Sequence, residues 1–200
     1  NGNEYIALLE SHRKETDKLV AEKLPEIQRE LDSIESSREH SKRRIDQIRA
    51  TPSSVVKRVE FLYKRGELEG RNIMLMGDND LVSIGIALTS LAEDIAVFDI
   101  DQDLLNLIRE LGEERGIKIG YNRYDARDPF SENLRGGYNV AVTDPPYTQE
   151  GFDLFLRRCV EAVGTNGRAI LVSYGFSPRS RERALPIQET ITKNGLVIEE

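Results

Sequence analysis

Six aspartates occur where apolar runs of the sequence end, and their positions could gather them at one edge of a binding cleft. In a parallel sheet whose strands alternate with helices, ligands bind beyond the carboxyl ends of the strands. Asp80 and Asp101 could instead cap helices, but capping does not account for all six acids. We call the set the acidic rim; it consists of Asp78, Asp80, Asp99, Asp101, Asp125 and Asp144. So many carboxylates at one edge predict a cationic ligand.

The first loop of the rim departs from the usual nucleotide-binding pattern. Residues 74–88 read MLMGDNDLVSIGIAL, in which the glycine Gly77 is followed by Asp78, Asn79 and Asp80. Glycine-rich loops at this place present backbone N–H groups to a phosphate or carboxylate. Two aspartates would instead repel an anion. A ligand that carries only positive charge suits such a loop better than an anion does.

Two further acids have positions suited to a nucleoside. Asp99 ends the run IAVFD about 20 residues beyond Gly77, where a carboxylate can accept hydrogen bonds from both ribose hydroxyls. Asp125, in YDARDP, would then lie near the base and accept from its exocyclic amine. Gly77, Asp99 and Asp125 are therefore the expected nucleoside-binding residues.

The motif VTDPPYTQ contains Asp144, Pro145 and Tyr147 directly after an apolar run, with two prolines that restrict the loop. It resembles the Asp-Pro-Pro-Tyr loop of class I S-adenosylmethionine-dependent methyltransferases that act on amino nitrogens. The resemblance implies that Asp144 and the Pro145 carbonyl accept hydrogen bonds from the target amine, beside the aromatic face of Tyr147. Holding the N–H groups in this way directs the nitrogen lone pair at a sulfonium-bound carbon.

From residue 50 onward, short apolar runs alternate with helical patterns, which predicts an α/β fold with a doubly wound, mostly parallel sheet. This architecture is Rossmann-like and is that of class I methyltransferases. Thr51 should cap a helix that has Pro52 at its first position. Strands are expected at 72–77, 95–99, 117–121, 139–143, 168–173 and 196–199, and later helices at 80–91, 102–115, 151–163 and 179–194. A seventh, antiparallel strand has no candidate, so we expect residues 50–200 to be a catalytic domain that continues in the natural chain.

Residues 1–49 are rich in charge and predict a helical arm of two or three helices. Pro25 is expected near the start of one of them. Apolar residues recur there at steps of three and four, so the arm should pack on the main domain or on a second copy in a homodimer. The apolar residues are Val20, Leu24, Ile27, Leu31 and Ile34.

The overall composition favours a cytoplasmic protein. The net charge is −7, which makes nucleic acid an unlikely partner because most of its binding energy comes from basic side chains. Cys159 is the one cysteine, which fits a reducing compartment. We expect no membrane span, no metal site and no prosthetic group, since neither a long apolar run nor a metal-ligand spacing is present.

Several motifs together resemble the branched-chain polyamine synthases, or N4-bis(aminopropyl)spermidine synthases, over about residues 44–200. They are IDQIRATP, VKRVEFLYKRGELEGRNIMLMGDNDLVSIGIAL, IAVFDID, TDPPYT and LVSYGFSPRS. Members of that family have Gly-Asp-Asp-Asp where this chain has Gly77 to Asp80, so an amide, Asn79, replaces the middle acid. They also begin with a winged-helix domain and continue beyond the position of Glu200, so we expect the natural chain to be longer.

The resemblance implies an aminopropyltransferase that uses decarboxylated S-adenosylmethionine as co-substrate and a polyamine such as spermidine as acceptor. It implies that Asp80 accepts the proton of the amine while Asp144 orients the nitrogen. Asp78 would lie near the aminopropyl end of the donor, and Asp46 and Tyr147 would line the path of the polyamine.

Two other functions remain open from the sequence. The Asp-Pro-Pro-Tyr loop also fits a methyltransferase that uses intact S-adenosylmethionine on an amine or a nucleic-acid base. A non-catalytic regulatory or scaffold protein built around the helical arm is the other alternative.

Overall fold

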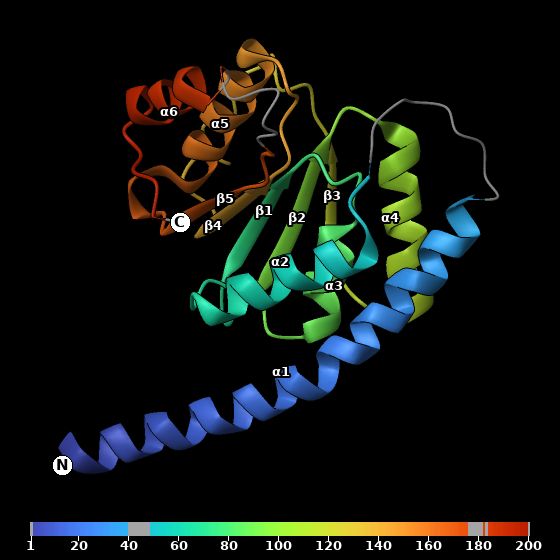
Figure 1. Cartoon of the computed structure of the whole chain (residues 1–200), viewed down its shortest axis with the longest axis vertical. Coiled ribbons are helices and arrows are strands. Elements are labelled where there is room, and N and C mark those ends of the chain that lie inside the picture. The colour runs from blue at the N-terminus through green and yellow to red at the C-terminus, as the bar shows by residue number, and fades with distance from the viewer. Residues whose placement is uncertain (1, 40–48, 176–181, 183, 200) are drawn as a thin grey trace.

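The computed structural model describes residues 2–39, 49–175, 182 and 184–199. Within them, five parallel strands form one sheet in the order β3-β2-β1-β4-β5. The strands are β1 Asn72–Met76, β2 Asp94–Asp99, β3 Gly120–Arg123, β4 Val140–Thr143 and β5 Ala169–Val172. The chain proceeds outward from β1 to β3 and then returns to the other side of β1 (Figure 1). The predicted doubly wound architecture is thus confirmed, and the order of the strands reverses between β1 and β4.

Each face of the sheet has its own core because successive side chains of a strand point to opposite sides. Ile73 and Leu75 of β1 pack in one core, and Met74 and Met76 pack in the other. Figure 1 shows α2, α3 and α4 on the first face and α5 and α6 on the second. These helices are α2 Pro52–Lys64, α3 Val82–Thr89, α4 Gln102–Arg115, α5 Gln149–Val163 and α6 Ala184–Lys193.

The arm is one helix, α1 Gly2–Glu39, and the prediction of two or three helices is wrong for the described residues. Pro25 lies inside it rather than near a start. An interior proline costs about 3 kcal/mol. Burial on both sides of the proline offsets this cost, since Val20 is 4% and Ile27 is 1% exposed. The C-terminal half of α1 packs on α2 and α3 as part of the main core, whereas its N-terminal part extends away from the body (Figure 1).

Two predicted strands differ from those observed. The predicted strand at 117–121 begins only at Gly120, because the Ile117 N–H still donates to the Gly112 carbonyl in the turn that ends α4 (3.0 Å). Residues 196–199 form no strand, so the prediction of a sixth strand is wrong for the described residues. Their side chains do not share one buried face: Leu196 packs beside α5 and α6, whereas Val197 is 83% exposed.

The start of α2 agrees more closely with the prediction from the sequence. Thr51 caps α2 by accepting from the Ser54 N–H at 3.3 Å, and Pro52 is the first helical residue, as predicted. The helix predicted at 179–194 is observed from Ala184, and its predicted start lies partly outside the described residues. Among the described residues, no helix combines the length and the apolar character needed to cross a membrane.

Candidate active site

Gly77 turns the chain out of β1 directly beside Asp99. Its φ is 72°, a left-handed conformation that favours glycine, and its N–H donates to the Phe98 carbonyl of β2 at 2.9 Å. A Cβ at this position would lie 3.8 Å from Asp99 Oδ2 and 3.4 Å from the ring of Phe155. The structure therefore brings together two of the three residues predicted to bind the nucleoside.

Asp99 and Asp101 have different surroundings although they are two residues apart. Asp99 Oδ1 accepts from the Asp101 N–H at 2.8 Å, and burial raises the pKa of the Asp99 carboxyl despite this bond. The Asp101 side chain accepts from the backbone N–H groups of Asp103 and Leu104 at the start of α4. Asp101 is thus a helix cap, which was the alternative that the sequence left open for it.

The Asp78 carboxylate points into the protein rather than toward solvent. The residue is 3% exposed, and its carboxylate accepts from the Val82 N–H at 2.7 Å and from the Ser83 N–H and hydroxyl. Leu81 has a φ of 60°, and α3 begins just after it with its first N–H groups directed at Asp78. Burial raises the pKa of Asp78 to about 7. Leu81 occupies the cap position of α3, and Asp78, rather than Asp80, accepts from the first N–H groups of that helix. The role of Asp78 near the aminopropyl end of the donor stays a prediction.

Asp80 and Asp144 are joined by one arginine that the sequence reasoning missed. Arg58 of α2 donates from Nη1 to Asp80 Oδ2 at 2.7 Å and from Nη2 to Asp144 Oδ2 at 3.0 Å. The other oxygen of Asp80 accepts from the Ala50 N–H at 2.7 Å. The side chain of Asp80 is 8% exposed and that of Asp144 is 39% exposed. The two predicted catalytic acids therefore form one cluster, with Asp144 on its solvent side.

Opposing influences act on the pKa of the Asp144 carboxyl, and the net direction is upward. Burial raises the pKa of the Asp144 carboxyl, Arg58 opposes the rise, and the neighbouring charge of Asp80 and a hydrogen bond with it add to the rise. Arg58 lies on a helical turn next to the apolar positions 55 and 59. Nothing in that local pattern indicates two carboxylate partners, because one of them follows β1 and the other follows β4.

Asp125 lies in a turn after β3 and is paired with a nearby arginine. Its carboxylate accepts from Arg127 Nε at 2.9 Å and from the Arg127 N–H at 2.9 Å. Arg127 lowers the pKa of Asp125 to about 2 through these hydrogen bonds. The turn begins beside β2, where the Tyr124 N–H donates to the Asp99 carbonyl at 2.9 Å. Recognition of a base by Asp125 stays a prediction, and the base would have to compete with Arg127 for the carboxylate.

The Asp-Pro-Pro-Tyr loop presents an aromatic pair. Tyr147 is 55% exposed, and its ring centroid lies 4.9 Å from that of Tyr174, which follows β5. The Tyr174 hydroxyl also donates to the Tyr147 carbonyl at 3.3 Å. Pro145 is buried at the start of the loop. Sequence reasoning missed Tyr174, and Asp46, the other residue predicted to line the polyamine path, lies outside the described residues.

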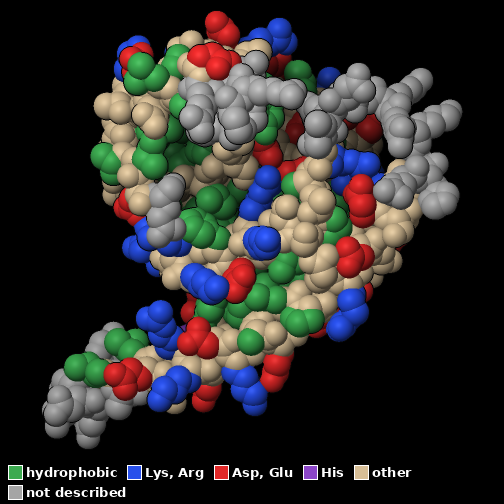
Figure 2. Space-filling view, viewed as in Figure 1, with side chains coloured by type: hydrophobic (Ala, Val, Ile, Leu, Met, Phe, Trp, Pro, Cys, Tyr) green, Lys and Arg blue, Asp and Glu red, His purple; other side chains and the backbone are tan. Residues whose placement is uncertain are grey.

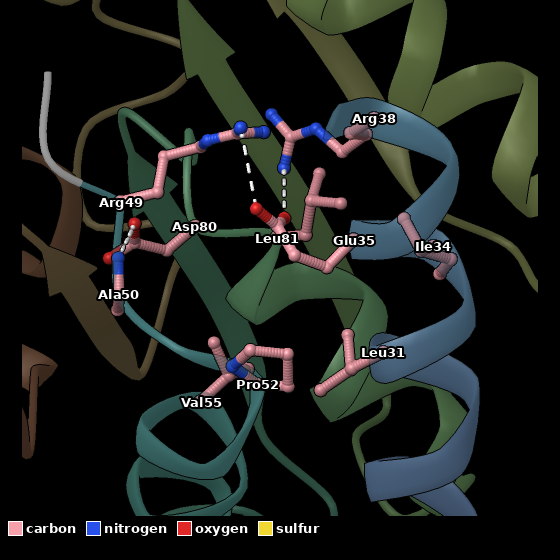
Figure 3. A pocket seen from close by; sticks show the side chains of 10 residues that line it. All are labelled: Leu31, Ile34, Glu35, Arg38, Arg49, Ala50, Pro52, Val55, Asp80 and Leu81. Atoms are coloured by element: carbon pink, nitrogen blue, oxygen red, sulfur yellow. Dashed lines mark hydrogen bonds and ion pairs between the residues drawn. The ribbon is translucent and has the colours of Figure 1, made fainter. Parts of the chain in front are cut away.

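The C-terminal end of α1 forms one wall of a small pocket at Asp80. Figure 3 shows Glu35 between two arginines there, with Arg49 Nη2 at 3.3 Å and Arg38 Nη1 at 4.0 Å from its carboxylate. Arg38 also donates to the Asn79 carbonyl at 3.2 Å. The pocket is lined by Leu31, Ile34, Glu35, Arg38, Arg49, Ala50, Pro52, Val55, Asp80 and Leu81. The predicted arm thus contributes side chains to the site.

The acidic rim is less negative than the sequence suggested. Asp80 and Asp144 share Arg58, and Asp125 pairs with Arg127. Asp78 and Asp101 are used at the starts of helices. On the face shown in Figure 2, basic and acidic side chains are mixed rather than separated into fields of one sign. The rim therefore offers acceptors at defined places, chiefly at Asp144, rather than a uniform negative potential.

The potential metal ligands among the described residues and the single cysteine lie apart from the Asp80–Asp144 cluster or are already paired. Within the described ranges, no group of three or more His, Cys, Asp or Glu side chains is disposed to hold a metal ion. Cys159 is buried in α5, and burial raises the pKa of its thiol to about 12, so it packs as a small apolar side chain.

Comparison with known proteins identifies the family. Residues 26–200 match the family described as the branched-chain polyamine synthase A C-terminal domain. An N(4)-bis(aminopropyl)spermidine synthase of Methanocaldococcus jannaschii is 30% identical over 82% of this chain and 47% of its own length. An uncharacterized protein of the same organism is 45% identical over 78% of this chain and 39% of its own length.

A solved structure agrees with these relatives. The branched-chain polyamine synthase of Thermus thermophilus, in complex with N4-aminopropylspermidine and 5'-methylthioadenosine, has a TM-score of 0.76 and 26% identity. The match covers 86% of this chain and 51% of that structure. The chain thus spans less than half of the two curated relatives and about half of the solved protein.

Proposed function

Because the chain belongs to the branched-chain polyamine synthase family, we propose that it transfers an aminopropyl group to a secondary amine of a polyamine such as spermidine. The donor is decarboxylated S-adenosylmethionine, and the products are a branched-chain polyamine and methylthioadenosine. The observation that carries the proposal is the Asp80–Asp144 pair, which lies beyond β1 and β4 where the strand order reverses. A relative with the same fold binds an aminopropylated polyamine together with the nucleoside product.

The reaction is an in-line displacement. The amine nitrogen forms a bond to the methylene next to the sulfonium, and the C–S bond breaks with its electron pair moving to sulfur. The sulfonium is already a good leaving group, so the protein mainly aligns the nitrogen and removes its proton. An aliphatic amine with a pKa of about 10 is mostly charged at neutral pH. A carboxylate must therefore bind the ammonium and then take or relay its proton.

We assign orientation of the nitrogen to Asp144, with the Pro145 carbonyl, and proton removal to Asp80. The exposures of the two acids support a relay, since Asp144 is 39% and Asp80 is 8% exposed. An acceptor that approaches from solvent meets Asp144 first, and the proton then passes to Asp80, which shares the Arg58 guanidinium with Asp144. Tyr147 and its neighbour Tyr174 would line the path with aromatic faces suited to a cationic chain.

Gly77 and Asp99 are assigned to the nucleoside because they lie side by side at the ends of β1 and β2. We also propose a cytoplasmic location, which suits a single buried thiol. A homodimer is proposed as well, since α1 carries Ile6, Leu8 and Leu9 exposed on its N-terminal part.

The Asp-Pro-Pro-Tyr loop supports a second candidate, N-methyl transfer from intact S-adenosylmethionine. The two functions differ in the donor, since the intact donor would bring its carboxylate toward a loop that ends in the nearly buried Asp80. Two negative charges brought close together repel each other unless both are well solvated. We therefore favour the decarboxylated donor.

Product analysis by mass spectrometry tests the proposal. The protein is mixed with a panel of polyamines and either the decarboxylated or the intact donor. We expect the mass of an acceptor to increase by one aminopropyl group with the decarboxylated donor, and we expect Asp80→Asn to abolish this gain. A mass gain of one methyl group with the intact donor would establish the second candidate instead. No gain with either donor, together with no binding of methylthioadenosine in calorimetry, would support a non-catalytic protein.

A further inference from the structure

Arg58 holds together the two acids to which the proposed function assigns the acceptor nitrogen. Its guanidinium contacts Asp80 at 2.7 Å and Asp144 at 3.0 Å through different nitrogens. The side chain is 19% exposed, so most of this contact is shielded from water. A planar fork of N–H donors can serve two carboxylates at once, which a single ammonium group on a flexible stem does less well.

The contact of Arg58 with Asp80 and Asp144, which we call the Arg58 clamp, affects the charge of the two acids. Two carboxylates that share one guanidinium lie close together, and in a half-buried site they cannot both be ionised cheaply without a cation, so one of them would then keep a proton. Of the charged groups around Asp144, Arg58 favours its ionised form and Asp80 disfavours it. When Asp144 is protonated, one of its oxygens becomes an O–H donor, so the carboxyl accepts fewer hydrogen bonds from an amine.

Further charges surround the clamp on the side of α1. Glu35 and Arg38 lie there, and Arg49 is paired with Glu35. The negative charge of Asp80 favours the charged form of Arg38. Asp78, behind the loop, adds to the negative potential at Arg38. Glu35 and Arg49 are held by their mutual ion pair, and Arg58 is the cation that contacts both acids within the part of the chain that the structure describes.

We propose that Arg58 is a positioning residue for aminopropyl transfer, one that holds Asp80 and Asp144 together and keeps Asp144 ionised to meet the acceptor amine. This inference rests on the proposed function. The ammonium then passes its proton to a carboxylate oxygen of the pair, and the freed nitrogen lone pair attacks the donor methylene. Arg58 itself exchanges no proton and forms no bond with the reacting atoms.

The test compares Arg58→Met with Arg58→Lys. Loss of the cation should raise the pKa of Asp144, because an opposite charge nearby favours the ionised form. In the plot of kcat/KM against pH, the acid limb should therefore move to higher pH in Arg58→Met, and by less in Arg58→Lys, which keeps a charge. At neutral pH we expect kcat to fall at least tenfold in Arg58→Met, while the dissociation constant for methylthioadenosine changes less than threefold.

Arg168→Met is the matched control. Arg168 pairs with Glu67 at 2.9 Å, just before β5 and thus at the end of the sheet opposite to the acidic rim. This variant also removes one arginine from a carboxylate, but it should leave the position of the acid limb unchanged. An equal displacement of the limb in both variants would overturn the inference, since it would reflect net charge alone.

Carbon-13 NMR titration of the aspartate carboxyls separates this inference from the proposed function. We expect the Asp144 titration midpoint to be higher in Arg58→Met than in the parent protein, and intermediate in Arg58→Lys. An unchanged midpoint in both variants would overturn the inference whatever the activity. A raised midpoint in a protein that transfers no aminopropyl group would refute the proposed function alone. If Arg58→Met does not fold, Arg58→Lys alone decides between these outcomes.

Discussion

Asp78→Asn should remove a pH dependence of stability that the buried Asp78 carboxyl creates. Asp78 is 3% exposed and accepts hydrogen bonds from the Val82 N–H and from the N–H and hydroxyl of Ser83. These bonds favour the carboxylate, whereas burial favours the neutral acid. Burial prevails, so the pKa of Asp78 in the folded protein is raised to about 7.

The sign of the effect follows from linkage. Since the folded pKa exceeds the unfolded one, the folded protein binds the proton more tightly, and this contribution to stability is fully present below about pH 4. It decreases as the pH rises and is lost above about pH 7. The shift from 3.8 to about 7 corresponds to about 4 kcal/mol, at about 1.4 kcal/mol for each unit.

Urea unfolding of both proteins at a series of pH values between 4 and 8 measures this effect. The useful quantity is the free energy of unfolding of Asp78→Asn minus that of the parent, because other titrating groups cancel in the difference. We expect the difference to increase by about 4 kcal/mol in favour of the variant from pH 4 to pH 8. Asp125→Asn provides a flat control: Arg127 lowers the pKa of Asp125 to about 2, so this carboxyl titrates below the measured range and the difference should stay nearly constant between pH 4 and pH 8.

A difference that stays constant across this range would refute the reasoning, because the pKa of Asp78 in the folded protein would then not lie above that in the unfolded chain. A difference that decreases with pH would show that the hydrogen bonds to the α3 backbone outweigh burial. In that case the site would hold Asp78 as an anion, and the acidic rim would be more negative than described above.

Two further predictions concern the first loop and the arm. Gly77→Ala should lower the free energy of unfolding by about 1–2 kcal/mol, because the φ of Gly77 is 72°, and should weaken methylthioadenosine binding in calorimetry. Gly66 has a φ of 73° and open space around it, so Gly66→Ala should lower stability by a similar amount and leave binding unchanged. Ile27→Ala should lower the free energy of urea unfolding by about 2–5 kcal/mol if α1 belongs to the main core, whereas Ile6→Ala, at 54% exposure, should change it by less than about 0.5 kcal/mol. Equal effects of the two glycine variants on binding, or of the two isoleucine variants on stability, would contradict these interpretations.

The sequence by itself determined the layers of the fold and the neighbourhood of the site. Runs such as 72–76 and 94–99 alternate with helical patterns, and this local periodicity is set by contacts within a few residues. Caps at Thr51 and Asp101 are similarly local. The rule that ligands bind at the carboxyl ends of parallel strands then brought Gly77 and Asp99 to one edge without further information.

Only the tertiary structure decided which groups meet at that edge. Arg58 and Asp144 are 86 positions apart, and their contact exists because α2 packs on α3 next to the end of β4. In the same way, α1 continues through Pro25 because the main core buries the residues on both sides of it. The inward orientation of Asp78 depends on the left-handed turn at Leu81. Residue type indicates that a carboxylate is present, but its charge is set by the burial and the cations that distant segments supply.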